Sequence, residues 1–101
     1  MEAARQSVEI LNKSYSTSEF LILCGPGNNG GDGYYIGIGL NKLKKCVRFI
    51  DVLGDRKKSP LCKQAFKKAK DLKFISAKAL KSISSKTVVV DAIFGIGGRI
   101  D

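Results

Sequence analysis

The residue types best suited to chemistry are gathered in one glycine-rich stretch, GPGNNGGDG at residues 25–33. The stretch directly follows an apolar run at residues 20–24. Its glycines would let a ligand approach the main chain, and a helix beginning just after it would turn unpaired N–H groups toward an anion. Asn28 and Asn29 add two amides, and Asp32 adds a carboxylate where a helix N-cap is expected. We therefore expect a ligand site here, the alternative being a tight turn in which Asp32 is a cap worth about 1 kcal/mol.

A second glycine-rich stretch, GIGGRID, occupies residues 95–101, after a run at 87–94 that predicts a buried strand and carries Asp91 near its end. The chain has no histidine, so a zinc site or a catalytic Ser–His or Cys–His pair is nearly excluded. Acid–base chemistry would fall to Asp, Glu, Lys or Tyr. Lys58 could meet a phosphate, although a solvent-facing lysine is the simpler interpretation in so basic a region.

The elements that must hold these stretches alternate along the chain. Strands are predicted at residues 20–24, 46–53, 74–75 and 87–94, and helices at 1–13, 33–45, 60–72 and 77–83. Because parallel neighbours need crossovers, this order predicts a three-layer α/β/α Rossmann-like fold with a parallel sheet and helices on both faces. Both glycine-rich stretches then lie at the carboxyl end of the sheet, where open sheets bind ligands. No linker or repeat indicates a second domain, so residues 1–101 are expected to form a single one.

Length and composition are typical of a small globular domain. With 101 residues and 44% hydrophobic content, the chain can build one core, but it is short for a complete fold of this kind. No apolar run approaches the roughly 20 residues that span a bilayer, and residues 1–4 do not begin like a secretory signal. We therefore expect no membrane partner and a cytoplasmic location. Cys24, Cys46 and Cys62 lack metal or redox spacing and are expected to be buried and reduced.

The net charge of +9 is concentrated in the middle of the chain. Residues 41–86 carry fifteen basic and three acidic side chains, a net charge of +12, whereas the segments before and after are weakly acidic. Such a segment could attract nucleic acid or a phosphorylated ligand. Lysine outnumbers arginine fourteen to four, which favours a solvated surface, and nucleic acid is not an expected partner.

Residues 25–30 also fit the dinucleotide fingerprint G-x-G-x-x-G. An ordinary dinucleotide fold places an acidic residue at the end of its second strand, where Asp51 and Asp55 are candidates, so a dehydrogenase remains open at this point. A P-loop is excluded, because neither glycine-rich stretch ends in Gly-Lys-Ser/Thr.

The longer motifs are more specific. CGPGNNGGDG at residues 24–33, VVDAIFGIG at residues 89–97 and the opening MEAA together resemble the YjeF N-terminal domain family, the NAD(P)H-hydrate epimerases. The resemblance implies an isomerase that interconverts the R and S epimers of the hydrated cofactors NADHX and NADPHX. A companion NAD(P)HX dehydratase then restores the normal cofactor. Members of this family are commonly homodimers.

The resemblance also implies roles for individual residues. Contacts to NAD(P)HX would come from Asn28, Asn29, Gly30, Gly31 and Asp32, and a phosphate cradle from Gly95, Ile96, Gly97, Gly98, Arg99, Ile100 and Asp101. Asn29 and Asp91 would hold a potassium ion. Epimerisation by loss and re-addition of the hydroxyl needs an acid–base group, for which Asp91 is the first choice and Asp32 the second. The alternative for Asp91 is an acceptor of backbone N–H groups that organises its loop.

The chain departs from the family pattern in its second half. Many relatives have GTGLSR where residues 95–99 read GIGGR, and the family's later D-x-P-S-G segment is absent. We therefore expect a fragment of the domain, incomplete at its C-terminus, with little epimerase activity alone. The alternative function is a non-catalytic YjeF-like nucleotide- or RNA-binding scaffold module with the basic segment facing RNA. The intact NNGGD motif favours the epimerase.

Overall fold

The computed structural model describes residues 2–15 and 19–94, in which helices and strands alternate. The elements are α1 (Glu2–Ser14), β1 (Glu19–Cys24), α2 (Asn28–Lys42), β2 (Val47–Asp51), α3 (Pro60–Ala69), β3 (Lys73–Phe74), the 3-10 helix η1 (Ala77–Ser82) and β4 (Thr87–Ala92). Every predicted element is present, although the helix expected at residues 77–83 is of the tighter 3-10 type. None of the helices in this described part is long and apolar enough to cross a membrane.

The four strands form one sheet in the order β3-β2-β1-β4, and every neighbouring pair is parallel. The register places the last residue of β1, Cys24, opposite Asp51 of β2 and Ala92 of β4. The carboxyl ends of these three strands are therefore level. Because the chain runs from β1 to β2 on one side and reaches β4 on the other, strand order reverses between β1 and β4. In open parallel sheets this is the position where ligands bind.

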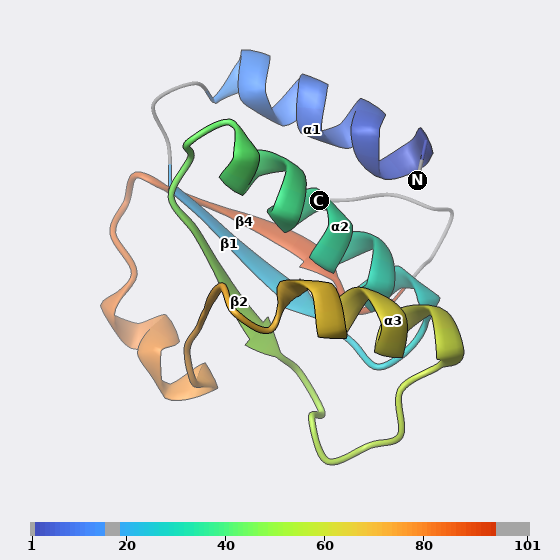
Figure 1. Cartoon of the computed structure of the whole chain (residues 1–101). Coiled ribbons are helices and arrows are strands. Elements are labelled where there is room, and N and C mark those ends of the chain that lie inside the picture. Colours follow the sequence, from blue (N-terminus) through green and yellow to red (C-terminus); the bar gives the residue numbers. More distant parts are fainter. Residues whose placement is uncertain (1, 16–18, 95–101) are drawn as a thin grey trace.

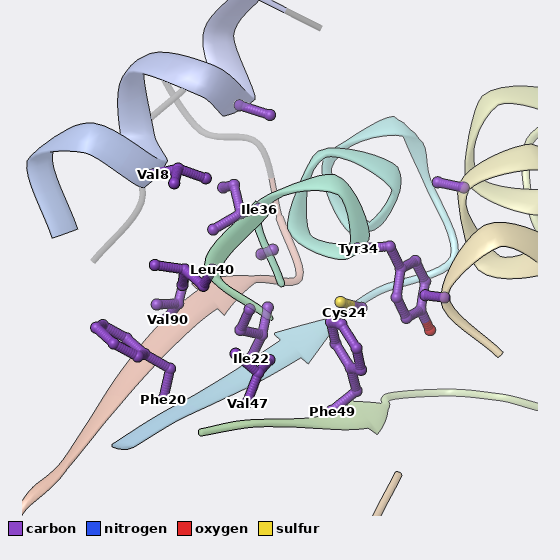
Figure 2. Packing of buried hydrophobic residues seen from close by; sticks show 14 of the residues in the cluster. Val8, Phe20, Ile22, Cys24, Tyr34, Ile36, Leu40, Val47, Phe49 and Val90 are labelled. Carbon is purple, nitrogen blue, oxygen red and sulfur yellow. The ribbon is translucent and has the colours of Figure 1, made fainter. Parts of the chain in front are cut away.

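The three α-helices lie on the same side of the sheet (Figure 1). Alternate residues of β1 face them, including Phe20 and Ile22, and these pack under Ile36 and Leu40 of α2, with Val8 of α1 alongside (Figure 2). The predicted α/β fold with a parallel sheet is confirmed, but the α-helices that the structure describes all lie on one face and not on both faces as predicted (Figure 1).

The start of α2 differs from the prediction. The helix begins at Asn28, five residues before the expected position, so most of the glycine-rich stretch is helical and not a loop. Close packing explains why glycines stand inside this helix: a Cβ atom at Gly30 would collide with the carbonyl oxygen of Gly25, and one at Gly31 would lie 3.2 Å from Cα of Cys62. Glycine has a low helix propensity, but here tertiary contact requires it inside a helix.

Two burial predictions are also wrong in part. The strand expected to be buried at residues 87–94 is a sheet edge in the described structure, where Val90 and Ala92 are buried while Val89 is 39% exposed. Cys24 and Cys62 are buried free thiols as expected, but Cys46 is exposed, because it precedes β2 and lies outside the covered part of the sheet.

Candidate functional site

The loop after β1 lies against the segment after β4. The N–H group of Gly25 donates a hydrogen bond to the carbonyl oxygen of Ala92 over 3.1 Å. A Cβ atom at Gly25 would lie 2.6 Å from the carbonyl oxygen of Ile93, so only glycine permits this approach. The loop after β1 and the end of β4 therefore lie side by side at the switch point, as the strand positions predicted. Gly95, Ile96, Gly97, Gly98, Arg99, Ile100 and Asp101 lie outside the described residues.

The N-terminus of α2 opens beside this contact. Its N-cap is Gly27, in an extended conformation with no side-chain cap, so the predicted N-cap role of Asp32 is wrong. The first N–H groups of a helix have no intrahelical acceptor and carry the positive end of the helix dipole. A Cβ atom at Gly27 would meet no atom of the described residues within 4 Å, so these residues leave open the space beside the N-cap. This arrangement can receive an anionic group.

Asp32 lies in the second turn of α2 and is only partly exposed. Its Oδ1 atom is buried and has no hydrogen-bond partner in the part of the chain that the structure describes. Burial raises the pKa of this carboxyl group. Asp32 therefore holds a proton more readily than an ordinary aspartate, and its buried oxygen can still take a ligand as a partner.

Asp91 is exposed at the penultimate position of β4. Its Oδ1 accepts a hydrogen bond of 3.0 Å from the N–H group of Ile93, which is the loop-organising contact considered as its alternative role. Because Val90 and Ala92 face the helices, the side chain of Asp91 lies toward the other face of the sheet.

The structure does not join the predicted cation ligands directly. Among the described residues, no hydrogen bond links Asn29 to Asp91, and no group of three or more His, Cys, Asp or Glu side chains could hold a metal ion. The amide oxygen of Asn29 and the carboxylate of Asp91 are nevertheless oxygen donors of the kind that hard cations prefer. The donor chemistry fits potassium, and its binding stays a prediction.

A polar network that the sequence did not predict is centred on Asp51, the last residue of β2. The carboxylate of Asp51 accepts a hydrogen bond of 3.3 Å from the Tyr34 hydroxyl and one of 3.0 Å from Nζ of Lys58. Nζ of Lys58 also lies 4.5 Å from the ring centroid of Phe66. Lys58 is thus neither solvent-facing nor available as a free cation. Asp51 ends the second strand as a dinucleotide fold requires, but its carboxylate is already occupied, which disfavours the ordinary dehydrogenase site.

Tyr34 is the fully buried member of this network. Its ring lies between α2 and α3, beside Phe49 and Cys24 (Figure 2), and its centroid is 5.3 Å from that of Phe49 and 5.5 Å from that of Phe66. Burial is the largest cause that raises the pKa of its hydroxyl far above the ordinary range. The hydroxyl therefore remains a donor to Asp51 at any physiological pH.

Ser59 connects the two helices at the site. Its Oγ accepts a hydrogen bond of 3.2 Å from the N–H group of Cys62 and so caps α3, while it donates one of 2.7 Å to Oδ1 of Asn28. The N–H group of Ser59 donates to the carbonyl oxygen of Pro26 over 2.8 Å. The predicted start of α3 at Pro60 is correct, and a serine just before such a proline is an N-cap signal in the sequence. Its bond to Asn28 has no such signal.

Known proteins resemble this chain in sequence and in fold. The family model described as "YjeF-related protein N-terminus" matches residues 1–101. The chain is 34% identical over 87 residues to an NAD(P)H-hydrate epimerase of Oenococcus oeni and 36% identical over 93 residues to one of Levilactobacillus brevis. These alignments cover 85% and 87% of this chain but 41% of each relative, so the chain spans less than half the length of either.

A solved structure shares the fold. The crystal structure of yeast ynu0, YNL200c, superimposes with a TM-score of 0.74 at 20% sequence identity. The match covers 96% of this chain and 46% of that one. At this identity the likeness establishes the architecture.

Proposed function

This chain belongs to the family of the YjeF-related protein N-terminus, and on that premise we propose that it binds NADHX and NADPHX and acts in interconverting their R and S epimers. The observation that carries the proposal is the contact of Gly25 with the segment after β4, beside the uncapped start of α2. It puts open backbone donors at the switch point of a parallel sheet, where a dinucleotide phosphate group would be bound.

The proposed binding residues come from two segments of the chain. Asn28, Asn29, Gly30, Gly31 and Asp32 would contact the hydrated cofactor from the first turns of α2. Main-chain amides of the segment from Gly95 to Asp101 would cradle its phosphates from the other side. A potassium ion held by Asn29 and Asp91 would supply positive charge near the anionic ligand.

The proposed chemistry needs one group that gives and takes a proton. The hydroxyl of the hydrated carbon leaves as water once it is protonated, and a new water loses a proton as it adds to the opposite face. We assign this acid–base role first to Asp91 and second to Asp32. Asp91 is exposed and its Oδ1 is oriented by the N–H group of Ile93, whereas burial favours the protonated form of Asp32.

The same proposal covers the domain organisation, location and partners of the chain. Residues 1–101 would form one domain of the YjeF N-terminal type, in the cytoplasm, and the product would pass to an NAD(P)HX dehydratase that acts on one epimer. A homodimer is the proposed assembly.

The proposal is tested by ligand binding. Thermal unfolding of the purified chain should shift upward with NADPHX or NADP⁺ in the presence of potassium. Turnover of NADPHX by this chain alone is expected to be low, since the family's D-x-P-S-G segment is not in it. Absence of any nucleotide effect would contradict the proposal. Tight, salt-sensitive RNA binding without a nucleotide effect would instead support the scaffold alternative.

A further inference from the structure

The hydroxyl of Ser59 makes two hydrogen bonds that fix which way its proton points. The backbone N–H group of Cys62 can only donate, so Oγ uses a lone pair there at 3.2 Å. Its own proton is then directed at Oδ1 of Asn28, 2.7 Å away. If the amide of Asn28 were reversed, its NH₂ group would face Oγ and the proton of Ser59 would lose this acceptor. The observed orientation satisfies both groups.

Ser59 is itself held in place from several directions. Its N–H group donates to Pro26, and its carbonyl oxygen accepts from the N–H group of Lys63, both over 2.8 Å. The residue before it, Lys58, is bound to Asp51 at 3.0 Å. The serine hydroxyl is therefore held in one position beside the side chain of Asn28.

We infer that Ser59 is a positioning residue that makes Asn28 a hydrogen-bond donor toward the ligand. Because Oδ1 is turned toward Ser59, the NH₂ group with its two N–H bonds lies on the other side of the Asn28 amide, and Asn28 is exposed at the first position of α2. They add to the unpaired backbone donors of the same turn. The group bound at Asn28 is consequently a hydrogen-bond acceptor, which we assign to a phosphate oxygen of the dinucleotide because the helix N-terminus beside it favours an anion. This assignment rests on the proposed function.

Three variants separate amide orientation from the capping of α3. Ser59→Thr keeps both the cap and the donor proton. Ser59→Asp keeps the cap, because aspartate caps as well as serine, but it only accepts hydrogen bonds and would turn the NH₂ group of Asn28 toward itself. Oδ1 would then face the ligand. Gln64→Glu adds the same charge on the exposed first part of α3 and leaves the bond of Ser59 intact.

Affinity for NADPHX and NADP⁺ is measured by calorimetry, and thermal unfolding checks the fold. We expect Ser59→Thr and Gln64→Glu to bind within about twofold of the wild type, and Ser59→Asp to bind about tenfold or more weakly at an unchanged melting temperature. Equal affinity of Ser59→Asp and wild type would overturn the role of Ser59 while leaving the proposed function intact.

The orientation is also tested without any ligand. In ¹H–¹⁵N spectra of the free protein, the side-chain NH₂ signals of Asn28 should be nearly unchanged by Ser59→Thr and should move downfield in Ser59→Asp, where a carboxylate accepts from them. Unmoved signals in Ser59→Asp would overturn the inference. A wild type that binds neither nucleotide would overturn the proposed function, and these spectra would still decide the orientation.

Discussion

Nζ of Lys58 lies 3.0 Å from Oδ2 of Asp51, and the side chains of the pair are only 12% and 24% exposed. One lysine of a strongly basic segment is thus held within the fold. The pair closes the loop at residues 52–59, whose last residue caps α3 and contacts Asn28. The geometry of the candidate ligand site therefore depends on an ion pair outside the glycine-rich motif.

Removing the negative charge of this pair should destabilise the protein. Asp51→Asn leaves the ammonium of Lys58 largely buried without a counter-charge, and we expect the free energy of unfolding to fall by about 2 kcal/mol. Urea denaturation measures the change. The matched control is Glu19→Gln, which breaks the 4.0 Å pair with Arg48 at a more exposed position and should cost less than about 0.5 kcal/mol. Equal effects of the two variants would contradict the structural role of the Asp51 pair.

Gly30 should be intolerant of any side chain. In Gly30→Ala the new Cβ would collide with the carbonyl oxygen of Gly25, which accepts a hydrogen bond from the buried thiol of Cys62. The N–H group of Gly25 is bonded to β4, so this residue has little room to shift, and we expect a loss of about 3 kcal/mol or more. Gly27→Ser is the control. The new Cβ would meet no atom within 4 Å in the described part of the chain, the φ of −88° suits any residue, and serine is a good N-cap. Its stability should change by less than about 0.5 kcal/mol, and chemical denaturation compares the two.

Asp32 should be unfavourable for stability near neutral pH. Its pKa is raised by burial, so the folded state binds this proton more tightly than the unfolded state, and stability falls as pH rises from the ordinary aspartate pKa through the raised one. Asp32→Ala should gain about 0.5 kcal/mol from helix propensity at every pH. At pH 7 the free energy of unfolding should rise further, because the variant lacks the unfavourable buried carboxylate, and this additional rise should disappear in acid. A gain that is the same at pH 3 and pH 7 would refute the burial effect, and denaturation series at the two values decide it.

The three cysteines should react at different rates with a thiol reagent such as Ellman's. Cys46 is exposed, whereas Cys24 and Cys62 are buried and burial raises the pKa of both thiols. The native protein should therefore release one equivalent of chromophore quickly and the other two only on unfolding. Cys46→Ser should remove the fast phase. If Cys24 or Cys62 reacted rapidly in Cys46→Ser, the core around β1 and α3 would open readily, contrary to this prediction.

Asp91 should matter to the ligand far more than to the fold. In Asp91→Asn the amide oxygen can still accept from the N–H group of Ile93, and the side chain is exposed, so unfolding should change by less than about 0.5 kcal/mol. The potassium-dependent part of the thermal shift with NADPHX should be lost. Asp71→Asn, an exposed aspartate near β3, is the control that should retain it. A retained potassium effect in Asp91→Asn would remove this residue from the proposed site.

The sequence by itself determined the order of the elements, the parallel sheet and the edge at which the loop after β1 meets the end of β4. These features follow from short-range information: apolar periodicity marks each helix and strand, and chain direction places the carboxyl ends of parallel strands together. The start of α3 at Pro60 is equally local, since a fixed φ angle and a missing N–H group suit a first helical turn.

Only the tertiary structure decided how the site is held. Gly30 in the first turn of α2 packs directly against the backbone of Gly25, and the hydrogen bond from Ser59 to Asn28 joins residues 31 positions apart. Tyr34 and Lys58 meet Asp51 from different elements, 17 and 7 residues away. Such contacts leave no periodic pattern, because they arise when packing of the helices on the sheet brings distant side chains within hydrogen-bond distance.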